Sequence, residues 1–170
     1  VWQNAGYDRT QVQVRRASWA VSPEGGVEIQ CALVVTAVHI QAIGEVDACW
    51  TVAPDGELSC RLSCQRDTAL PMLPRFGLRL FLTQTMDRVA YLGYGPYESN
   101  PDTPQASRLG RVGTTAAAID EDDERPQEDG SHWGCRYAHL RDGDGNGLLV
   151  TADAPFAFDA SPYTQEGLTE

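Results

Sequence analysis

The sequence contains no lysine, and all 13 of its basic residues are arginines. A side-chain Schiff base therefore cannot form, which excludes lysine-dependent aldolase and pyridoxal-phosphate chemistry within this chain. The 24 aspartates and glutamates outnumber the arginines and give a net charge of −11. Because such a field repels phosphate groups, we expect neither a nucleic-acid partner nor an anionic membrane surface.

Long apolar runs are also missing. No segment approaches the roughly 18 apolar residues that a membrane-spanning helix needs. The first four residues, Val1-Trp2-Gln3-Asn4, have neither the basic nor the apolar region of a signal peptide. We therefore expect a cytoplasmic protein. Since the chain does not begin with Met, we also expect it to be part of something longer.

The five cysteines form an odd number and follow no framework spacing. We predict that they are small, buried apolar residues in a reducing compartment. A disulfide between Cys60 and Cys64 is excluded if both lie on one extended strand, because their Cα atoms would then be too far apart. The remaining cysteines are Cys31, Cys49 and Cys135.

Apolar and polar residues alternate with period two over most of the first ninety residues. This pattern, with turn signals such as Pro54-Asp55-Gly56 between its repeats, predicts antiparallel strands and an all-β domain that occupies residues 1–170. A helix is expected to begin near Tyr163 and run to Leu168, with Ser161 as its cap. The predicted strands are 11–21, 27–35, 46–52, 58–64, 76–82, 89–92, 133–140, 148–151 and 155–158.

The stretch 95–131 interrupts this pattern with four prolines and the acidic run 120–124, and we predict a long loop region there. At its start, Pro96 and Pro101 cannot donate to a β-ladder and Gly95 frees the backbone, which predicts that the tract 95–102 lies outside any sheet. Loops on a rigid β scaffold are frequent binding sites. Glu98 and Asp102 are the best candidates for ligand contact, and the structural alternative is that they cap and pin the loop. The acidic run is interpreted as a solvated loop.

Two groups of residues have the composition of metal sites. The stretch Asp142–Gly147 begins like a calcium loop, but its twelfth position is Asp153 and the flanking helices are missing, so a hairpin turn at Asn146-Gly147 is favoured. On a strand, Cys135 and His139 stand about 13 Å apart. We predict that His132 faces the opposite side, so that one zinc ion cannot reach all three. No metal site is predicted, and His39 is interpreted as a surface or packed residue.

No catalytic residue is predicted in this chain. A Gly-x-Ser-x-Gly nucleophile elbow is not found. Carboxylates are plentiful, but their spacing singles out no pair of the kind that glycoside hydrolysis requires.

Several motifs, taken in order, resemble the C-terminal domain of bacterial β-galactosidases of glycoside hydrolase family two, often called the small chain. The tract Gly-Pro-x-Glu-x-x-Pro-Asp at 95–102 is the most specific of them. Family members commonly have Tyr and Arg where this chain has Asn100 and Thr103, which puts an aromatic or cationic contribution from the loop in doubt. The matching segments are 74–77, 93–102, 126–130 with Arg136 after it, 144–149 and 161–163.

The resemblance implies an antiparallel β-sandwich of the galactose mutarotase-like supersandwich type, here as an incomplete domain. It implies that the catalytic glutamates of a retaining enzyme lie in a barrel domain of the same protein, and that this segment alone is inactive. No cofactor is expected in this segment. The parent enzyme that the resemblance implies is of a kind that can use Mg or Na ions. The substrate-proximal loop would contain Gly95, Pro96, Glu98, Asn100 and Asp102.

Two other functions stay open at this point. An independent carbohydrate-binding module would hold sugar on an aromatic platform such as Trp133 or Tyr97. An aldose mutarotase would need a histidine, His132 or His139, and a carboxylate in one pocket. An exposed sheet edge would also favour a homo-oligomer.

Overall fold

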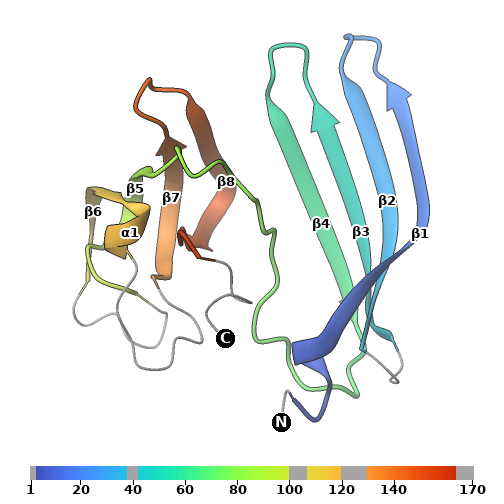
Figure 1. Cartoon of the computed structure of the whole chain (residues 1–170). Coiled ribbons are helices and arrows are strands. Elements are labelled where there is room, and N and C mark those ends of the chain that lie inside the picture. The colour runs from blue at the N-terminus through green and yellow to red at the C-terminus, as the bar shows by residue number, and fades with distance from the viewer. Residues whose placement is uncertain (1–2, 38–41, 100–106, 120–129, 164–170) are drawn as a thin grey trace. The chain divides into compact units, whose positions relative to one another are not determined.

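The structure is a computed structural model that describes residues 3–37, 42–99, 107–119 and 130–163. The chain divides into two compact units, Val1–Leu78 and Arg79–Glu170, and each is described by itself. Each unit holds one four-stranded antiparallel sheet, which we name sheet A and sheet B (Figure 1). The all-β fold class is thus confirmed, while the single domain over residues 1–170 stays a prediction. The described helices are short: the 3-10 turn η1 (Tyr7–Arg9) and α1 (Ala116–Ile119).

Among the described residues, no helix combines the length and the apolar character that crossing a bilayer requires.

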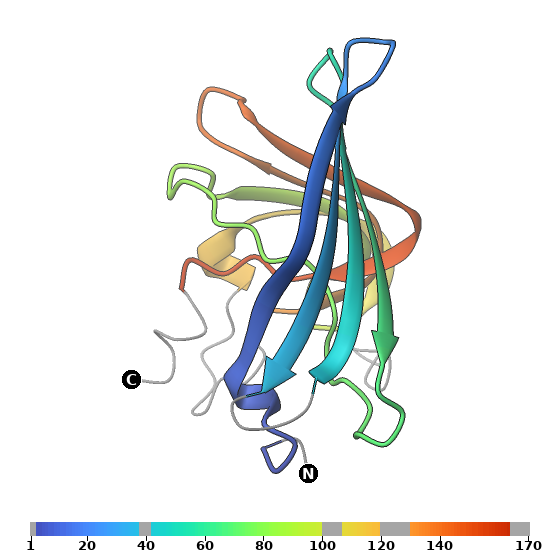
Figure 2. The same ribbon diagram turned by 90° about the vertical axis from the view of Figure 1, so that its right-hand side faces the viewer.

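Sheet A contains its strands in sequence order, so that each strand pairs with the next one along the chain. The hairpin turns after the first and third strands lie at the same end of the sheet (Figure 2). Gly25 and Gly56 have φ values of 85° and 93° in these turns, a left-handed conformation that favours glycine. The strands are β1 (Thr10–Val21), β2 (Val27–Ala37), β3 (Ala42–Val52) and β4 (Leu58–Arg66).

The register of sheet A aligns apolar residues with apolar residues across all four strands. For example, Trp19 pairs with Ile29, Ile29 with Trp50, and Trp50 with Cys60. Since side chains on a strand alternate between the two faces, the period-two pattern of the sequence gives the sheet one apolar face and one polar face. The apolar face consists of Val12, Val14, Ala17, Trp19, Val21, Val27, Ile29, Cys31, Leu33, Val35, Val46, Ala48, Trp50, Val52, Leu58, Cys60, Leu62 and Cys64.

Sheet B has the strand order β6-β5-β7-β8, in which the central strand β5 precedes its neighbour β6 in sequence. One face of this sheet is covered by a hydrophobic cluster that includes α1 and the residues after β8. The strands are β5 (Arg88–Gly95), β6 (Arg108–Thr115), β7 (His132–Arg141) and β8 (Gly147–Phe158). The buried members of the cluster are Val89, Tyr91, Ile119, Cys135, Ala138 and Ala160.

Two expectations about strands are wrong. The segment 76–82 is not part of a strand, although its apolar residues alternate, because alternation alone does not supply a neighbouring strand with which to pair. The region 95–131 is not one irregular loop, since it contains β6 and α1. The sequence pattern does not predict the strand β6, because Gly110 and Gly113 occupy positions where a strand usually carries large apolar residues.

The expectation that His132 and Cys135 face opposite sides is also wrong. Both side chains are buried, and the Cys135 thiol donates to the His132 carbonyl oxygen over 3.5 Å. The pairing of β7 with β8 shifts register between His132 and Cys135, and Gly134 has a φ of 69°. A β-bulge of this kind adds one residue and turns the following side chains to the same face.

The hairpin predicted after β7 is confirmed, but its turn lies at Asp142–Asn146 and not at Asn146-Gly147, since Gly147 is the first residue of β8. The Asp142 carboxylate accepts hydrogen bonds from the backbone N–H groups of Asp144 and Asn146, each over 2.9 Å. Hydrogen bonds from the Asn146 side chain and from these backbone groups lower the pKa of Asp142. The positive φ falls on Gly145. The carboxylate therefore closes a turn.

The five cysteines are free, as expected, although only Cys135 is fully buried and the other four are half-buried. At the C-terminal end, the Ser161 hydroxyl accepts a hydrogen bond from the Tyr163 N–H over 3.1 Å. The helix predicted to follow, His39 and the acidic run 120–124 lie outside the described residues.

Candidate functional site

Three of the five predicted site residues, Gly95, Pro96 and Glu98, lie in the described part of the chain, whereas Asn100 and Asp102 lie outside it. The expectation that Gly95 stands outside the sheet is wrong, because Gly95 is the last residue of β5 and pairs with Arg108. The Gly95–Pro96 peptide bond is cis, and the chain leaves the sheet there.

A glycine is required at position 95 for a steric reason. A Cβ atom built there would overlap the hydroxyl oxygen of Tyr91 and lie 3.0 Å from Cγ2 of Val112. The same holds for Gly93, whose Cβ would overlap Sγ of Cys135. Positions 93 and 95, on either side of Tyr94, are thus glycines because buried side chains of the core approach the backbone closely there.

Ser99 fixes the base of the loop. Its side chain is 1% exposed, and its hydroxyl donates to the Tyr94 carbonyl oxygen over 3.1 Å and accepts from the Trp133 N–H over 3.0 Å. Its backbone N–H donates to the Ser131 carbonyl oxygen over 2.8 Å. These bonds join the loop to the end of β5 and to the start of β7, and they satisfy a hydroxyl that would otherwise be costly to bury.

Ser107 holds the outer part of the loop. Its hydroxyl donates to two carbonyl oxygens, that of Tyr97 over 3.2 Å and that of Glu98 over 3.4 Å. The residues 96–99 are therefore held from both sides, by Ser107 next to β6 and by Ser131 next to β7. The sequence reasoning missed all three serines, and the only signal was their position beside the predicted loop.

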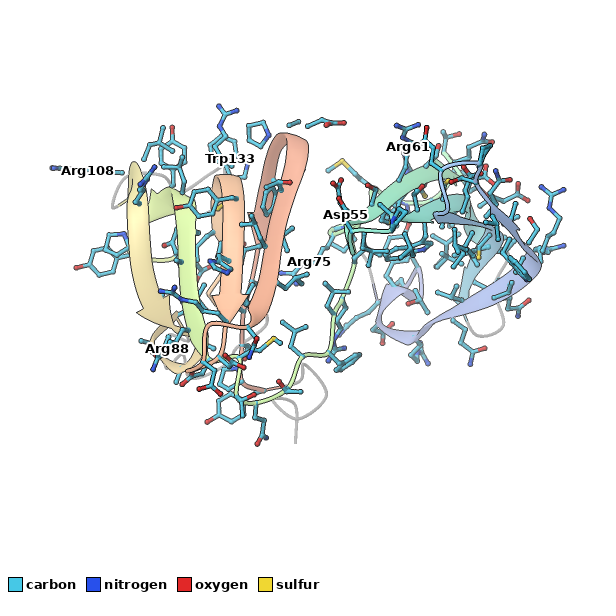
Figure 3. The ribbon with its side chains drawn as sticks, turned by 90° about the horizontal axis from the view of Figure 1, so that it is seen from above. Asp55, Arg61, Arg75, Arg88, Arg108 and Trp133 are labelled. Atoms are coloured by element: carbon cyan, nitrogen blue, oxygen red, sulfur yellow. The ribbon has the colours of Figure 1, made fainter. Side chains whose placement is uncertain are left out.

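Aromatic side chains border the loop. The rings of Tyr94 and Trp133 stack with centroids 5.4 Å apart and an interplanar angle of 23°. Trp133 is 39% exposed and Tyr97 is also exposed. Figure 3 shows Trp133 and Arg108 at one end of sheet B and Arg88 at the other end. The exposed aromatic surface lies at the end of the sheet where the loop begins.

A buried pair lies beneath the end of β5. The rings of Tyr91 and His132 stack with centroids 4.5 Å apart, and the Tyr91 hydroxyl lies 3.2 Å from Nδ1 of His132. Burial, and to a smaller extent the neighbouring Cys135, raises the pKa of Tyr91 to about 12. Both side chains are fully buried, so we interpret the pair as support for the loop.

The buried polar side chains of the described residues are three serines and His132, with no carboxylate among them. The Glu98 side chain is half-buried in the loop. Within the described ranges, no three His, Cys, Asp or Glu side chains are placed to hold a metal ion. Because the serine side chains are buried, the site presents to a ligand the half-buried Glu98 carboxylate and exposed aromatic rings, a combination suited to a polar ligand with apolar patches.

Comparison with known proteins agrees with the motifs. A family model described as "Beta galactosidase small chain" matches residues 1–170. The chain is 40% identical over 169 residues to a β-galactosidase of Actinobacillus pleuropneumoniae, which covers 99% of this chain and 16% of that protein. It is 38% identical over 121 residues to a β-galactosidase of Staphylococcus xylosus, covering 71% of this chain and 12% of that protein.

A third relative is a β-galactosidase of Arthrobacter sp. (strain B7), 31% identical over 154 residues, which covers 90% of this chain and 15% of that protein. The chain thus spans about a sixth of the length of these relatives or less. The family model covers every residue of the chain, and the loop at the end of β5 carries the motif that suggested the resemblance. On these grounds the chain belongs to the β-galactosidase small chain family.

Proposed function

We propose that this chain is a non-catalytic segment of a retaining β-galactosidase that hydrolyses terminal β-galactosides, and that its loop 95–102 helps to wall the sugar site. Two findings support the assignment to a segment of a larger enzyme: the chain belongs to the family, and it matches only 16% of the length of its relative from Actinobacillus pleuropneumoniae. The catalytic acid/base and nucleophile would then lie in a barrel domain of the same protein. Mg or Na ions, where the parent enzyme uses them, would also be bound outside this segment.

One observation carries the proposal for the loop. Ser99 and Ser107 hold the backbone of residues 96–99 in place, while Pro96 and Tyr97 remain exposed. A rigidly held backbone with exposed side chains costs little conformational entropy on binding, which favours contact with a ligand.

We further propose a cytoplasmic location and a homo-oligomeric parent enzyme.

The proposed contact between the loop and the sugar is tested by Glu98→Gln in the full-length enzyme. We expect KM for a nitrophenyl β-galactoside to rise about fivefold, since a carboxylate that accepts hydrogen bonds from sugar hydroxyls would lose its charge. Glu57→Gln, in the exposed turn between β3 and β4, is the matched control and should leave KM unchanged. An unaltered KM for Glu98→Gln would remove the loop from the sugar site.

The absence of catalysis is tested with the isolated chain. It should not hydrolyse the nitrophenyl galactoside at any concentration. Turnover by pure material, abolished by a single carboxylate substitution within the chain, would contradict the proposal.

An independent carbohydrate-binding module is the second candidate, because Trp133 and Tyr97 are exposed. Isothermal titration of the isolated chain with galactose or lactose separates the two functions, since saturable heat favours a module. A mutarotase ranks last, because His132 is buried against Tyr91 and its ring is not accessible to a sugar.

A further inference from the structure

We propose that the stacked side chains of Tyr94 and Trp133 form a platform that binds the apolar face of a galactoside ring. The inference rests on the proposed function and extends it from the loop to the stacked pair that Tyr94 forms with Trp133. The two rings lie 5.4 Å apart at 23°, beside the point where the loop leaves β5.

The platform is preorganised by the same serine that holds the loop. The Trp133 N–H donates to Oγ of Ser99, and this hydroxyl donates to the carbonyl oxygen of Tyr94. One buried side chain thus fixes the backbones of both aromatic residues and of the loop. A ligand that contacts the loop and the rings would find both already in place, which lowers the entropic cost of binding.

The bulge after Trp133 allows the close approach of its neighbour. Gly134 has a φ of 69°, and a Cβ atom there would lie 2.9 Å from Cδ2 and 3.1 Å from Cε2 of the Tyr94 ring. Any other residue at this position would push the Tyr94 ring away. The bulge, the glycine and the stacked pair therefore form one structural unit.

The rings are not needed to fill the core of sheet B. The buried aromatic contacts of that core are made by Tyr91 with His132 and Phe158, whereas Trp133 is 39% exposed. An indole with this much exposed surface, held in one orientation, is available to a ligand. Its apolar area would be buried on contact, which is favourable.

The surroundings of the rings suit a sugar. Leu109 pairs with Tyr94, and Arg111 pairs with Leu92 two residues before Tyr94, so that both side chains share the face of Tyr94. Both are exposed. A galactopyranose has several C–H groups on one face and hydroxyls around its rim. The rings and Leu109 would contact the C–H face, and the Arg111 guanidinium would donate to the hydroxyls.

The test uses the full-length enzyme and a non-hydrolysable thiogalactoside, so that equilibrium binding is measured separately from turnover. Trp133→Leu keeps an apolar side chain but removes the flat ring, and we expect the Kd to rise about tenfold. Trp133→Phe keeps a ring that can stack, and its Kd should stay within about threefold of the original value. Leu149→Ala, an exposed apolar residue near the other end of sheet B, is the control and should bind normally.

If Trp133→Leu binds the thiogalactoside like the original enzyme, the platform is overturned while the proposed function stands. If Leu and Phe variants lose binding equally, a steric role of the indole replaces stacking, and the proposal also fails. If the full-length protein hydrolyses no galactoside, the proposed function fails. In that case the Kd values of the Trp133→Leu and Trp133→Phe variants for the thiogalactoside still show whether the platform binds sugar.

Discussion

Sheet A and sheet B are both four-stranded and antiparallel, yet their apolar residues meet different surroundings. In sheet B, Val89 is 2% exposed and packs in a cluster that includes Ile119 of α1 and Ala160 after β8. In sheet A, Val14 is 63% exposed and Trp19 is 72% exposed on the apolar face, and all residues of β1 are exposed. The same kind of strand pattern therefore leads to a filled core in one unit, and in the other to an apolar face that is buried at Val46 and Ala48 but exposed along β1.

An amphipathic sheet thus needs a second layer, from outside its own strands, to cover its apolar face. Sheet B obtains its cover within its own unit, from residues outside the ladder. Sheet A consists of sequential hairpins, and its apolar face is of the kind that marks an interaction surface. We expect this face to be buried in the parent protein, where the sandwich predicted from the sequence requires another layer.

The largest effect is expected from Gly93→Ala in sheet B. The new Cβ would overlap Sγ of Cys135 and lie 3.2 Å from its Cα, so the core would have to shift, at a cost of about 3 kcal/mol. Urea denaturation of the chain measures this change. Gly113→Ala on the neighbouring strand is the control, because nothing lies within 4 Å of its Cβ position. Equal stability of the two variants would mean that sheet B is not tightly packed.

High pH should destabilise sheet B. Burial raises the pKa of Cys135 from 9.0 to about 11, so the neutral thiol is favoured in the folded state. The resulting stability is fully present below pH 9.0 and is lost as the pH rises to about 11, by roughly 2 to 3 kcal/mol. Denaturation curves across this range test the effect. Cys135→Ala should flatten the decline, and an unchanged decline would assign it to other groups.

A pair of valine substitutions compares the two sheets directly. Val89→Ala should lower the free energy of unfolding by about 2 kcal/mol, because it removes methyl groups from a filled core. Val14→Ala should change it by less than about 0.5 kcal/mol in the isolated chain, since the side chain is exposed. Thermal denaturation of the two variants under identical conditions gives the answer. A large loss for Val14→Ala would show that the apolar face of sheet A is covered even in the isolated chain.

Ser99→Ala should destabilise the chain somewhat less than Val89→Ala. It leaves the part-buried backbone N–H of Trp133 without its acceptor and should cost about 1 to 2 kcal/mol. The near-ultraviolet circular dichroism of Trp133 should also weaken, because the indole loses its fixed orientation. Ser59→Ala, on the exposed side of β4, should alter neither signal. If Ser99→Ala behaves like this control, the serine does not hold the loop.

Much of sheet A could be predicted, because its strands are sequential and its alternation is regular. The pattern at 46–52, for example, continues through the turn at Pro54-Asp55-Gly56 into Leu58, and the structure pairs these strands in that order. The failures lie where contacts are distant in sequence. The segment 76–82 alternates but has no ladder, and β6 forms despite Gly110 and Gly113 because β5 lies beside it.

At the candidate site, the motif at 95–102 marked the loop but not what holds it. Ser99, Ser107 and Ser131 are polar residues of a type common in any loop, and only their burial between two strands distinguishes them. The bulge at Gly134 likewise could not be predicted. It moves Cys135 to the side of His132 and brings the Tyr94 ring against the backbone.

Local sequence patterns were enough to predict the all-β class, most strands of both sheets, the hairpin after β7 and the family of the chain. These follow from local periodicity, from turn residues and from a motif that is contiguous in the chain. The tertiary structure alone decided which sheet buries its apolar face, why Gly93 and Gly95 must be glycines, and how one serine joins the loop to two aromatic rings. Such features depend on distances between residues that are far apart in sequence, which a one-dimensional pattern does not contain.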